Sequence, residues 1–322
     1  MSRLGILLRN HTWLVPLLLL AIAVGVNVYL QDNFFMQRVL NGNLRVMLPL
    51  MILAVGQAIV ILAGGIDLSV GAMVSLVNTV FVTLISADSG GLELAGAMLV
   101  GVGVGALAGA VNGLCVAVLR LQPIVTTYAT SFIFAGLALA ILPRPGGSVP
   151  RDLTRFYRDY ILEVPVAAYG IALLIILWLL LRRTRFGHHL YAVGGNDEAA
   201  RASGVRVGLV RFGSYVATGV FSALAAIALT MSIGSGNARI GDDMTLSSIV
   251  AVVLGGTRLA GGRGGAIGAV IGVAILSIIR NIISFAGIPS WYQTLVDALI
   301  ILAALAGPGL VYLIRRQRND GN

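Results

Sequence analysis

The chain has 322 residues, of which 58% are hydrophobic and 11% are charged, and its formal net charge is +9. A soluble globular protein has roughly 25% charged residues, so this composition excludes an ordinary soluble domain and indicates an integral membrane protein. All 22 basic residues are arginine, and the absence of lysine excludes a phosphate-binding GxxxxGK[ST] loop and a Schiff-base lysine.

Continuous apolar runs, separated by charged or turn-rich breaks, predict membrane-spanning helices. A helix needs about 20 apolar residues to span a bilayer, whereas barrel strands would alternate in hydrophobicity. The predicted fold class is therefore an all-α polytopic membrane protein, with one transmembrane domain over residues 1–322. About ten spans are expected, at residues 12–30, 44–63, 69–86, 93–118, 123–142, 164–182, 209–232, 245–256, 266–286 and 291–313. The eighth of these, 245–256, is too short to span unless the helix is broken or tilted.

Arginine accumulates at the amino end, in the stretch 182–211 and in the tail after residue 313. Cytoplasmic segments of membrane proteins are enriched in Lys and Arg. Six spans before residue 182 and four after it place all three segments in the cytoplasm, with both termini inside. Loops 143–163 and 233–244 are then outside, although the first of them carries four arginines that argue against this orientation. Scattered arginines of this kind indicate membrane topology and not nucleic-acid binding.

Two segments, 64–71 and 255–262, share the pattern GGxxLxxG after an aliphatic run. Paired glycine-broken segments in a transporter point to a pathway or hinge. One interpretation is that the glycines end one helix and that Asp67 or Ser69 caps the next. The other is a cytoplasmic gate in which Asp67 approaches Arg258. The candidate gate or hinge residues are Gly64, Gly65, Asp67, Ser69, Gly71, Gly255, Gly256 and Arg258.

Glycine also recurs at four-residue steps in two of the predicted spans. Such spacing strips the side chains from one helix face and lets a neighbouring backbone approach closely. We interpret these runs as packing surfaces without a chemical role. They comprise Gly101, Gly105, Gly109 and Gly113 in the fourth span, and Gly264, Gly268 and Gly272 at the ninth.

The cytoplasmic stretch "YAVGGNDEAARASGVRV", residues 191–207, predicts a short capped helix. Asn196 or Asp197 starts it, strong helix formers follow, and Gly204 stops it. Its small side chains leave a flat surface that can fill a groove on a cytoplasmic partner. The alternative is a simple tether between the sixth and seventh spans.

Arg280 and Asp297 lie almost symmetrically about the turn at residues 287–290. At 1.5 Å per residue, each is about 12 Å from that turn. An antiparallel hairpin would bring them to similar depth, so we predict a neutralising ion pair. The alternative is that Arg280 and Asn281 line a polar substrate pathway.

The sequence shows no catalytic or metal-binding pattern. The three histidines, His11, His188 and His189, have no cysteines or paired carboxylates at ligand spacing. A GxSxG nucleophile motif is also missing. We predict no enzymatic activity, metal or cofactor.

Several segments together resemble the inner-membrane permease subunits of bacterial ribose-type ABC sugar importers. They occur in the order typical of that family and cover nearly the whole chain. The segments are "NFF" at 33–35, "AVGQAIVILAGGIDLSVGAMVSL" from Ala54, "TRFGHHLYAVGGNDEAARASGV" from Thr184, "AVVLGGTRLAGGRGGAIGAVIG" from Ala251 and "GIPSWYQTLVDALIILAAL" from Gly287. One departure is Thr245-Leu246-Ser247, where a Glu-Leu-Asp-like run is expected.

The resemblance implies a type II-importer-like permease that pairs with a second copy or a sister permease in the bacterial inner membrane. A cytoplasmic ABC ATPase would drive it, and a periplasmic sugar-binding protein would dock on loops 143–163 and 233–244. The cargo would be a monosaccharide or a related small polyol-like solute.

Segment 182–210 would then be the cytoplasmic coupling segment that docks on the ATPase. Its candidate coupling residues are Gly194, Gly195, Asn196, Asp197, Glu198, Ala199, Ala200, Arg201 and Gly204. The rival function is an ion-gradient-driven secondary transporter of a small polar solute, with Arg280 and Asp297 as its coupling residues.

Overall fold

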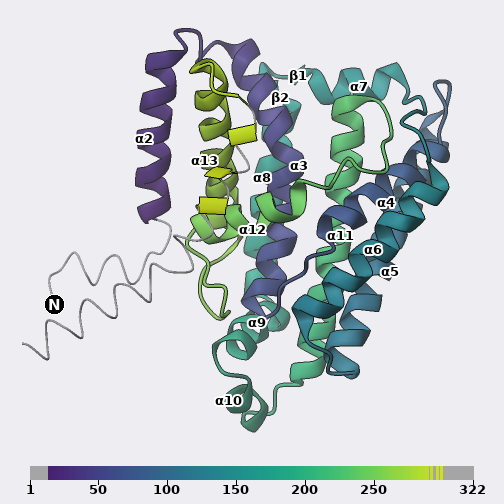
Figure 1. Cartoon of the computed structure of the whole chain (residues 1–322), viewed down its shortest axis with the longest axis vertical. Coiled ribbons are helices and arrows are strands. Elements are labelled where there is room, and N and C mark those ends of the chain that lie inside the picture. Colours follow the sequence, from purple (N-terminus) through teal and green to yellow (C-terminus); the bar gives the residue numbers. More distant parts are fainter. Residues whose placement is uncertain (1–13, 290, 293–294, 297, 300–322) are drawn as a thin grey trace, which may run out of the picture.

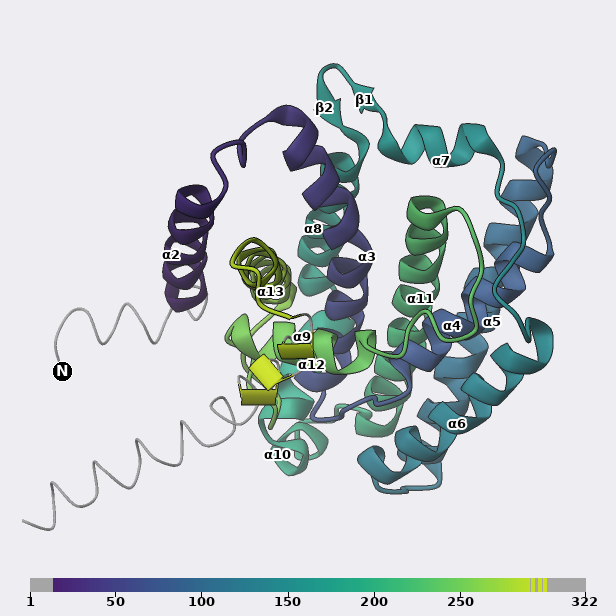
Figure 2. The same ribbon diagram turned by 45° about the horizontal axis from the view of Figure 1, so that its top comes forward.

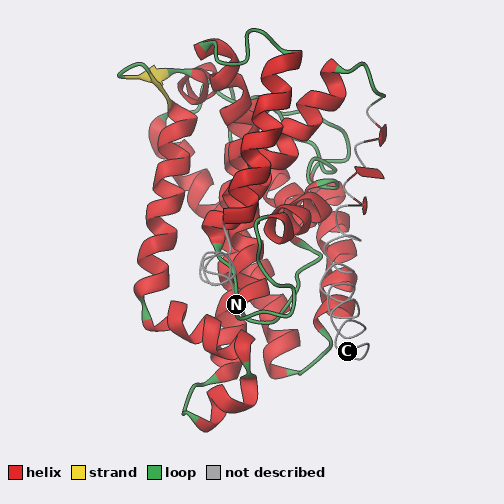
Figure 3. Ribbon diagram, turned by 90° about the vertical axis from the view of Figure 1, so that its left-hand side faces the viewer, coloured by secondary structure: helices red, strands yellow, loops and turns green. Residues whose placement is uncertain are grey.

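The computed structural model describes residues 14–289, 291–292, 295–296 and 298–299. Within this part of the chain the regular structure is helical apart from one short antiparallel hairpin, which pairs β1 (Tyr160–Ile161) with β2 (Val164–Pro165). Figure 3 shows the hairpin at one end of a bundle of long helices. The all-α prediction is confirmed.

Nine of the predicted spans coincide with helices, and the tenth, 291–313, lies largely outside the described residues. Six of the helices in the described part are long and apolar enough to cross a membrane, whereas α2, α4 and α12 are shorter. The number of spans therefore stays a prediction. The nine helices are α2 (Leu14–Leu30), α3 (Gln37–Leu62), α4 (Val70–Thr83), α5 (Gly91–Gly113) with its π-helical extension Leu114–Val118, α6 (Pro123–Ile141), α8 (Val166–Arg183), α11 (Val207–Ile233), α12 (Met244–Leu254) and α13 (Ala266–Phe285).

Helix α12 was expected to be short, and it has 11 residues. At 1.5 Å per residue it is about 16 Å long, roughly half of a hydrocarbon core. A left-handed Gly234 ends α11, and the chain runs without helix until α12 begins. Figure 1 shows α12 about halfway between the two ends of the bundle. The chain thus reaches α12 by a non-helical segment that is folded back among the helices.

Helix α11 is central and packs against α3, α4 and α5. A Cβ atom on Gly105 would meet the backbone of Gly219, and one on Gly109 would meet the backbone of Tyr215. The glycine spacing in α5 therefore allows close approach to α11, as the sequence predicted. In the same way Gly268 and Gly272 of α13 pack against the backbone of α12 and its C-terminal glycine.

The outer helices expose apolar side chains. Only 28% of the apolar window of α5 and its extension is buried, and the value falls to 22% in α6 and 17% in α8. A soluble protein rarely exposes apolar surface of that extent. These three helices therefore form a surface suited to lipid.

Two sets of short elements mark the opposite ends of the bundle (Figures 1 and 2). Helices α9 (Arg185–Gly195) and α10 (Asp197–Ala202) lie at one end, and α7 (Arg151–Arg158) lies with the hairpin at the other. The sequence did not predict α7, α9 or the hairpin. Gly146 and Gly236 exchange both backbone hydrogen bonds, so the loops 143–163 and 233–244 contact each other.

Candidate functional site

Helix α10 has the start and stop that the sequence predicted. The Asn196 side chain accepts a hydrogen bond from the Ala199 N–H at 2.9 Å, and Gly204 adopts a φ of +82° after the helix. Arg211 of α11 pairs with Asp197 at 3.2 Å. The predicted short capped helix is confirmed, and this ion pair fixes α10 to the start of a long central helix.

Three glycine pairs meet at the α10 end of the bundle, and we call this contact the glycine junction. It comprises Gly64 and Gly65 after α3, Gly194 and Gly195 at the end of α9, and Gly261 and Gly262 in the loop after α12. The Gly262 N–H donates to the carbonyl of Leu62 at 3.1 Å, which joins the two GGxxLxxG segments directly. Gly194 lies against both partners of that hydrogen bond.

The junction requires glycine for two physical reasons. Gly64, Gly261 and Gly262 have φ values of +79°, +88° and +69°, a region that other residues rarely adopt. A Cβ on Gly261 would lie 3.0 Å from the Cα atoms of both Gly194 and Gly64. The backbones of three distant segments can approach this closely only because they carry no side chains there.

Helix α9 also contacts the loop after α12 through Tyr191. Its hydroxyl donates to the Gly264 carbonyl at 2.9 Å, and the Arg182 guanidinium lies 5.9 Å from the centre of its ring. Burial raises the pKa of Tyr191, and the positive charge of Arg182 opposes this effect only in part. The hydroxyl therefore stays a hydrogen-bond donor at neutral pH and holds α9 on the loop.

The glycines of both repeated motifs end helices, which confirms the first part of the capping interpretation. Ser69 directly precedes α4, but its side chain makes no capping hydrogen bond, so the second part was wrong for Ser69. After α3, the N–H of Gly65 donates to Val60 and that of Gly64 to Ile61. After α12, Thr257 and Gly256 make the same two hydrogen bonds, to Val252 and Val253. This pair of bonds is the Schellman motif. The two motifs are offset by one residue, since the left-handed glycine is the first of the pair at Gly64 and the second at Gly256.

Asp67 is fully buried, and its described hydrogen bonds are with Ser69 and Asn112. Its Oδ1 accepts from the Ser69 N–H at 2.8 Å and from the Ser69 hydroxyl at 2.7 Å, and Asn112 of α5 donates to both carboxylate oxygens. Thr130 of α6 donates to Asn112 in turn. The alternative interpretation, in which Asp67 approaches Arg258, is not observed among the described residues, because Arg258 is exposed in the loop after α12.

The remaining candidate gate residues lie in two further contacts. The N–H of Gly71 donates to the Thr245 hydroxyl at 3.0 Å, and Gly71 packs against the backbone of Gly241. Gly255 packs against Gly268 of α13. With the hydrogen bonds among Asp67, Ser69 and Asn112, the described structure distributes the predicted gate over four contacts, and the glycine junction is the one of them that joins both motifs.

Arg280 and Asn281 line a cavity of about 330 Å³ enclosed by α3, α11, α12 and α13. The Arg280 guanidinium donates to the Ser247 hydroxyl at 2.6 Å, and the Asn281 amide donates to Asn43 at 3.3 Å. Asp297, the predicted ion-pair partner of Arg280, lies outside the described residues. The arrangement offers charged and neutral hydrogen-bond donors to a polar solute inside an otherwise apolar bundle.

Some polar residues at these sites were missed in the sequence. Ser277 is one of them: it precedes the predicted candidates Arg280 and Asn281 by three and four residues, so it shares their face of α13. This signal was available. Asn112 was a polar residue inside an apolar span and carried the same kind of signal. No sequence pattern near Asn43 or Ser247 identifies them as part of the site, because their hydrogen-bond partners are remote in the sequence.

The chain matches the family described as "branched-chain amino acid transport system / permease component" over residues 39–305. The chain belongs to this permease family. The permease is 38% identical over 258 residues to a ribose import permease of Bacillus subtilis (strain 168), with 79% of each chain covered. It is 33% identical over 306 residues to a ribose import permease of Escherichia coli (strain K12), covering 92% of this chain and 94% of the relative.

A third relative is the galactose/methyl galactoside import permease of Escherichia coli (strain K12), 30% identical over 330 residues with 97% of each chain covered. No solved structure matches the permease. The family description mentions amino acids, whereas these relatives are named for sugars.

The relatives are import permeases, and the described part of the chain has six helices long and apolar enough to cross a membrane. The permease is therefore a non-enzymatic, multi-pass membrane protein of the inner membrane.

Proposed function

We propose that the permease is the membrane subunit of an ABC importer that moves a monosaccharide or a related small polyol-like solute from periplasm to cytoplasm. The observation that carries this proposal is the nearly full-length match to sugar import permeases. ATP hydrolysis belongs to a separate ATPase subunit. A second copy or a sister permease completes the pathway, and both termini lie in the cytoplasm.

Helix α10 is the proposed contact with the ATPase. Glu198 and Ala199 are exposed on it, and Arg201 follows on its last turn. A displacement of α10 would reach the bundle through the Asp197–Arg211 ion pair and through Gly194, which lies in the last turn of α9. Since Gly194 touches both the end of α3 and the loop after α12, one movement would act on both glycine motifs.

The cavity beside Arg280 is the proposed solute pathway. Its volume of about 330 Å³ lies at the lower end of the range for ligand pockets, about 300–1,000 Å³. Arg280 and Asn281 can donate to sugar hydroxyl oxygens, and the carboxylate of Asp243 on the cavity wall can accept from hydroxyl groups. Apolar neighbours such as Leu50 and Leu229 suit the C–H faces of a sugar ring.

The opposite end of the bundle is the proposed docking surface for the sugar-binding protein. It carries α7, in which Arg151, Arg155 and Arg158 alternate with acidic and aromatic residues, and the paired loops 143–163 and 233–244. An acidic partner surface would complement the arginines.

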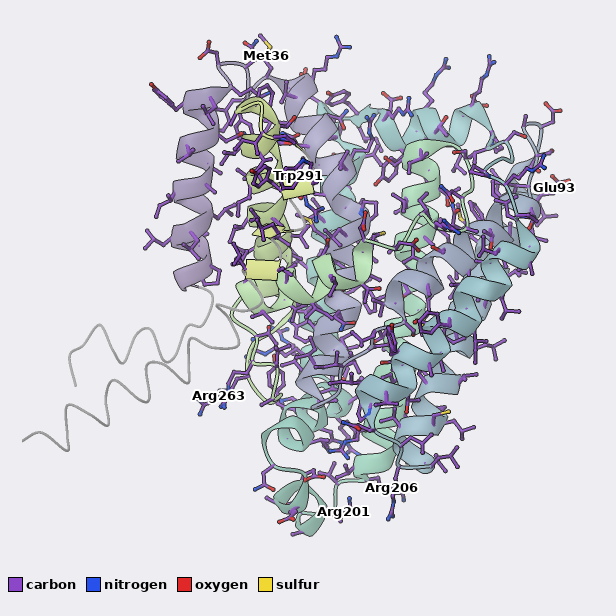
Figure 4. All side chains as sticks on the ribbon, viewed as in Figure 1. Met36, Glu93, Arg201, Arg206, Arg263 and Trp291 are labelled. Atoms are coloured by element: carbon purple, nitrogen blue, oxygen red, sulfur yellow. The ribbon has the colours of Figure 1, made fainter. Side chains whose placement is uncertain are left out.

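The test is ATP hydrolysis by the permease reconstituted in lipid with its candidate ATPase, with and without sugar-loaded binding protein. Glu198→Arg should abolish the stimulation while the permease stays folded. Glu93→Arg is the matched control, because Glu93 is equally exposed but lies toward the opposite end of the molecule, as Figure 4 shows. Sugar flux driven by an ion gradient without the ATPase would refute the proposal.

A further inference from the structure

Two adjoining cavities lie at the α10 end of the bundle, away from the cavity beside Arg280. The first, which we call the basic cavity, has a volume of about 520 Å³. Three arginines from three different elements line it: Arg120 after the π-helical turn, Arg201 of α10 and Arg211 of α11. The described residues that line it include no carboxylate, so the cavity concentrates positive charge.

The three arginines are held in place by different means. Arg211 is half-buried and shares the carboxylate of Asp197, which reaches it from the next element. Arg120 has a φ of 57°, a conformation that is uncommon outside glycine and often marks a functional position. It follows directly on the π-helical turn Leu114–Val118, and such turns are frequent at functional sites. Gln122 and Ser214 add neutral polar groups to the wall.

The second cavity, which we call the apolar groove, has a volume of about 620 Å³. Val118, Val205, Leu209 and Phe212 line it together with Arg201 and Arg206, and Val118 and Leu209 are each 61% exposed. The two cavities share the wall formed by Ala117, Arg201, Val207 and Gly208. A strongly basic compartment therefore continues into an apolar one.

This pair of cavities lies where two membrane helices end. One spanning helix finishes at Val118 and another begins at Val207, so the arginines stand at the boundary between lipid and water. Figure 4 shows Arg201 and Arg206 together at this end of the molecule, opposite Met36. Basic pockets between helices at that depth suit phospholipid headgroups, and a neighbouring apolar groove suits an acyl chain.

We propose that the two cavities together bind one anionic phospholipid. Its phosphate lies among Arg120, Arg201 and Arg211, and one acyl chain follows the apolar groove past Val118 and Leu209. A soluble phosphate would satisfy the arginines but would leave the groove without an occupant. The groove therefore favours a lipid as the source of the phosphate.

The bound phosphate would compete with Asp197 for Arg211. Both anions are accessible to the same guanidinium, because the side chains of Arg211 and Asp197 are 35% and 40% exposed. Loss of that pair would free α10 from the start of α11. Anionic lipid would thus replace the Asp197–Arg211 pair by a contact with Arg201 and so adjust the position of α10.

The first experiment measures lipid selectivity of the permease alone. The protein is placed in nanodiscs containing equal amounts of dioleoyl phosphatidylglycerol and dioleoyl phosphatidylcholine, and retained lipids are counted by native mass spectrometry. Arg120→Gln should reduce the enrichment of phosphatidylglycerol about fivefold, the effect of one basic residue at a membrane surface. Arg185→Gln is the control, since Arg185 is an exposed arginine at the same end that lines neither cavity.

A second variant separates a lipid from a soluble anion. Leu209→Asn should lower retention of phosphatidylglycerol and leave binding of inorganic phosphate, measured by calorimetry, unchanged. Thermal stability in pure phosphatidylcholine shows that each variant is folded. Equal enrichment in the parent and Arg120→Gln would overturn the site, and full retention of lipid in Leu209→Asn would overturn the lipid in favour of a soluble phosphate. Neither measurement involves the ATPase, so its failure to associate would leave this result unaffected.

Discussion

Replacing Gly194 by alanine tests whether the glycine junction depends on contact between bare backbones. The new methyl group would meet the carbonyl oxygen of Leu62, and it would lie 2.6 Å from the backbone nitrogen of Gly262. These are the acceptor and donor of the hydrogen bond that joins the two glycine motifs. Neither atom belongs to a flexible side chain, so the backbones themselves must separate.

The magnitude follows from two contributions. An extra methyl group in a tightly packed site costs about 1–3 kcal/mol, and loss of the Gly262–Leu62 hydrogen bond adds about 0.5–1.5 kcal/mol. We expect Gly194→Ala to destabilise the junction by about 2–4 kcal/mol. Alanine is favoured over glycine inside a helix by up to about 1 kcal/mol, which offsets part of this cost.

Gly195→Ala is the matched control. Gly195 follows in the same helix, and a Cβ on it would meet nothing within 4 Å. The helix-propensity gain is similar for both variants, so their difference reports the backbone contact. The assay compares the Tm of each purified variant in lipid. Equal Tm values in the two variants would refute the steric argument.

Three further variants test other contacts. Gly65→Leu should impair assembly or transport, because a Cβ there lies 2.8 Å from the Tyr215 hydroxyl oxygen. Adding Tyr215→Phe to this variant should relieve part of the defect. Normal assembly and normal transport in Gly65→Leu alone would show that this turn has no part in the mechanism. Asp67→Asn should lower the free energy of unfolding by about 1.5–3 kcal/mol, since a new amide would face the Asn112 amide. The double variant Asp67→Asn/Asn112→Asp should recover stability in thermal unfolding. Such recovery would show that the Asp67–Asn112 hydrogen bond is responsible, and not a general loss of polarity. Arg280→Gln should raise the KM for sugar uptake into proteoliposomes roughly tenfold or more, the effect of losing one charged hydrogen-bond donor, and an unchanged KM would place the solute elsewhere.

Local patterns predicted much of the fold. The long apolar runs located α5, α6, α11 and α13 within a few residues, because hydrophobic length alone decides whether a segment can remain in lipid. The start of helix α10 was predicted at Asn196 or Asp197, and the structure selects Asn196 as the cap; this prediction was possible because capping involves residues three apart in sequence. Helix α3 begins at Gln37, seven residues before its predicted start, because its polar first turns lie beyond the apolar run that defined the prediction.

Partners that are remote in the sequence were less predictable. Asp67 was expected near Arg258, yet the nearer donors are Ser69 and Asn112, and the second of these belongs to another helix. A buried carboxylate is satisfied by whichever donors the packing brings to it. Nothing in the residues around Asp67 identifies α5 as that source.

The sequence by itself determined that this protein is a helical membrane permease. It also determined where most of the helices begin and end, and which turns and helix faces carry glycine. Those properties depend on hydrophobic length, capping and residue size, which are local. Only the tertiary structure decided that Gly194 lies between the two glycine motifs and that Arg280 donates a hydrogen bond to Ser247 on the wall of a cavity. Such contacts depend on how helices cross, and a close crossing is set by the shapes of both partners together.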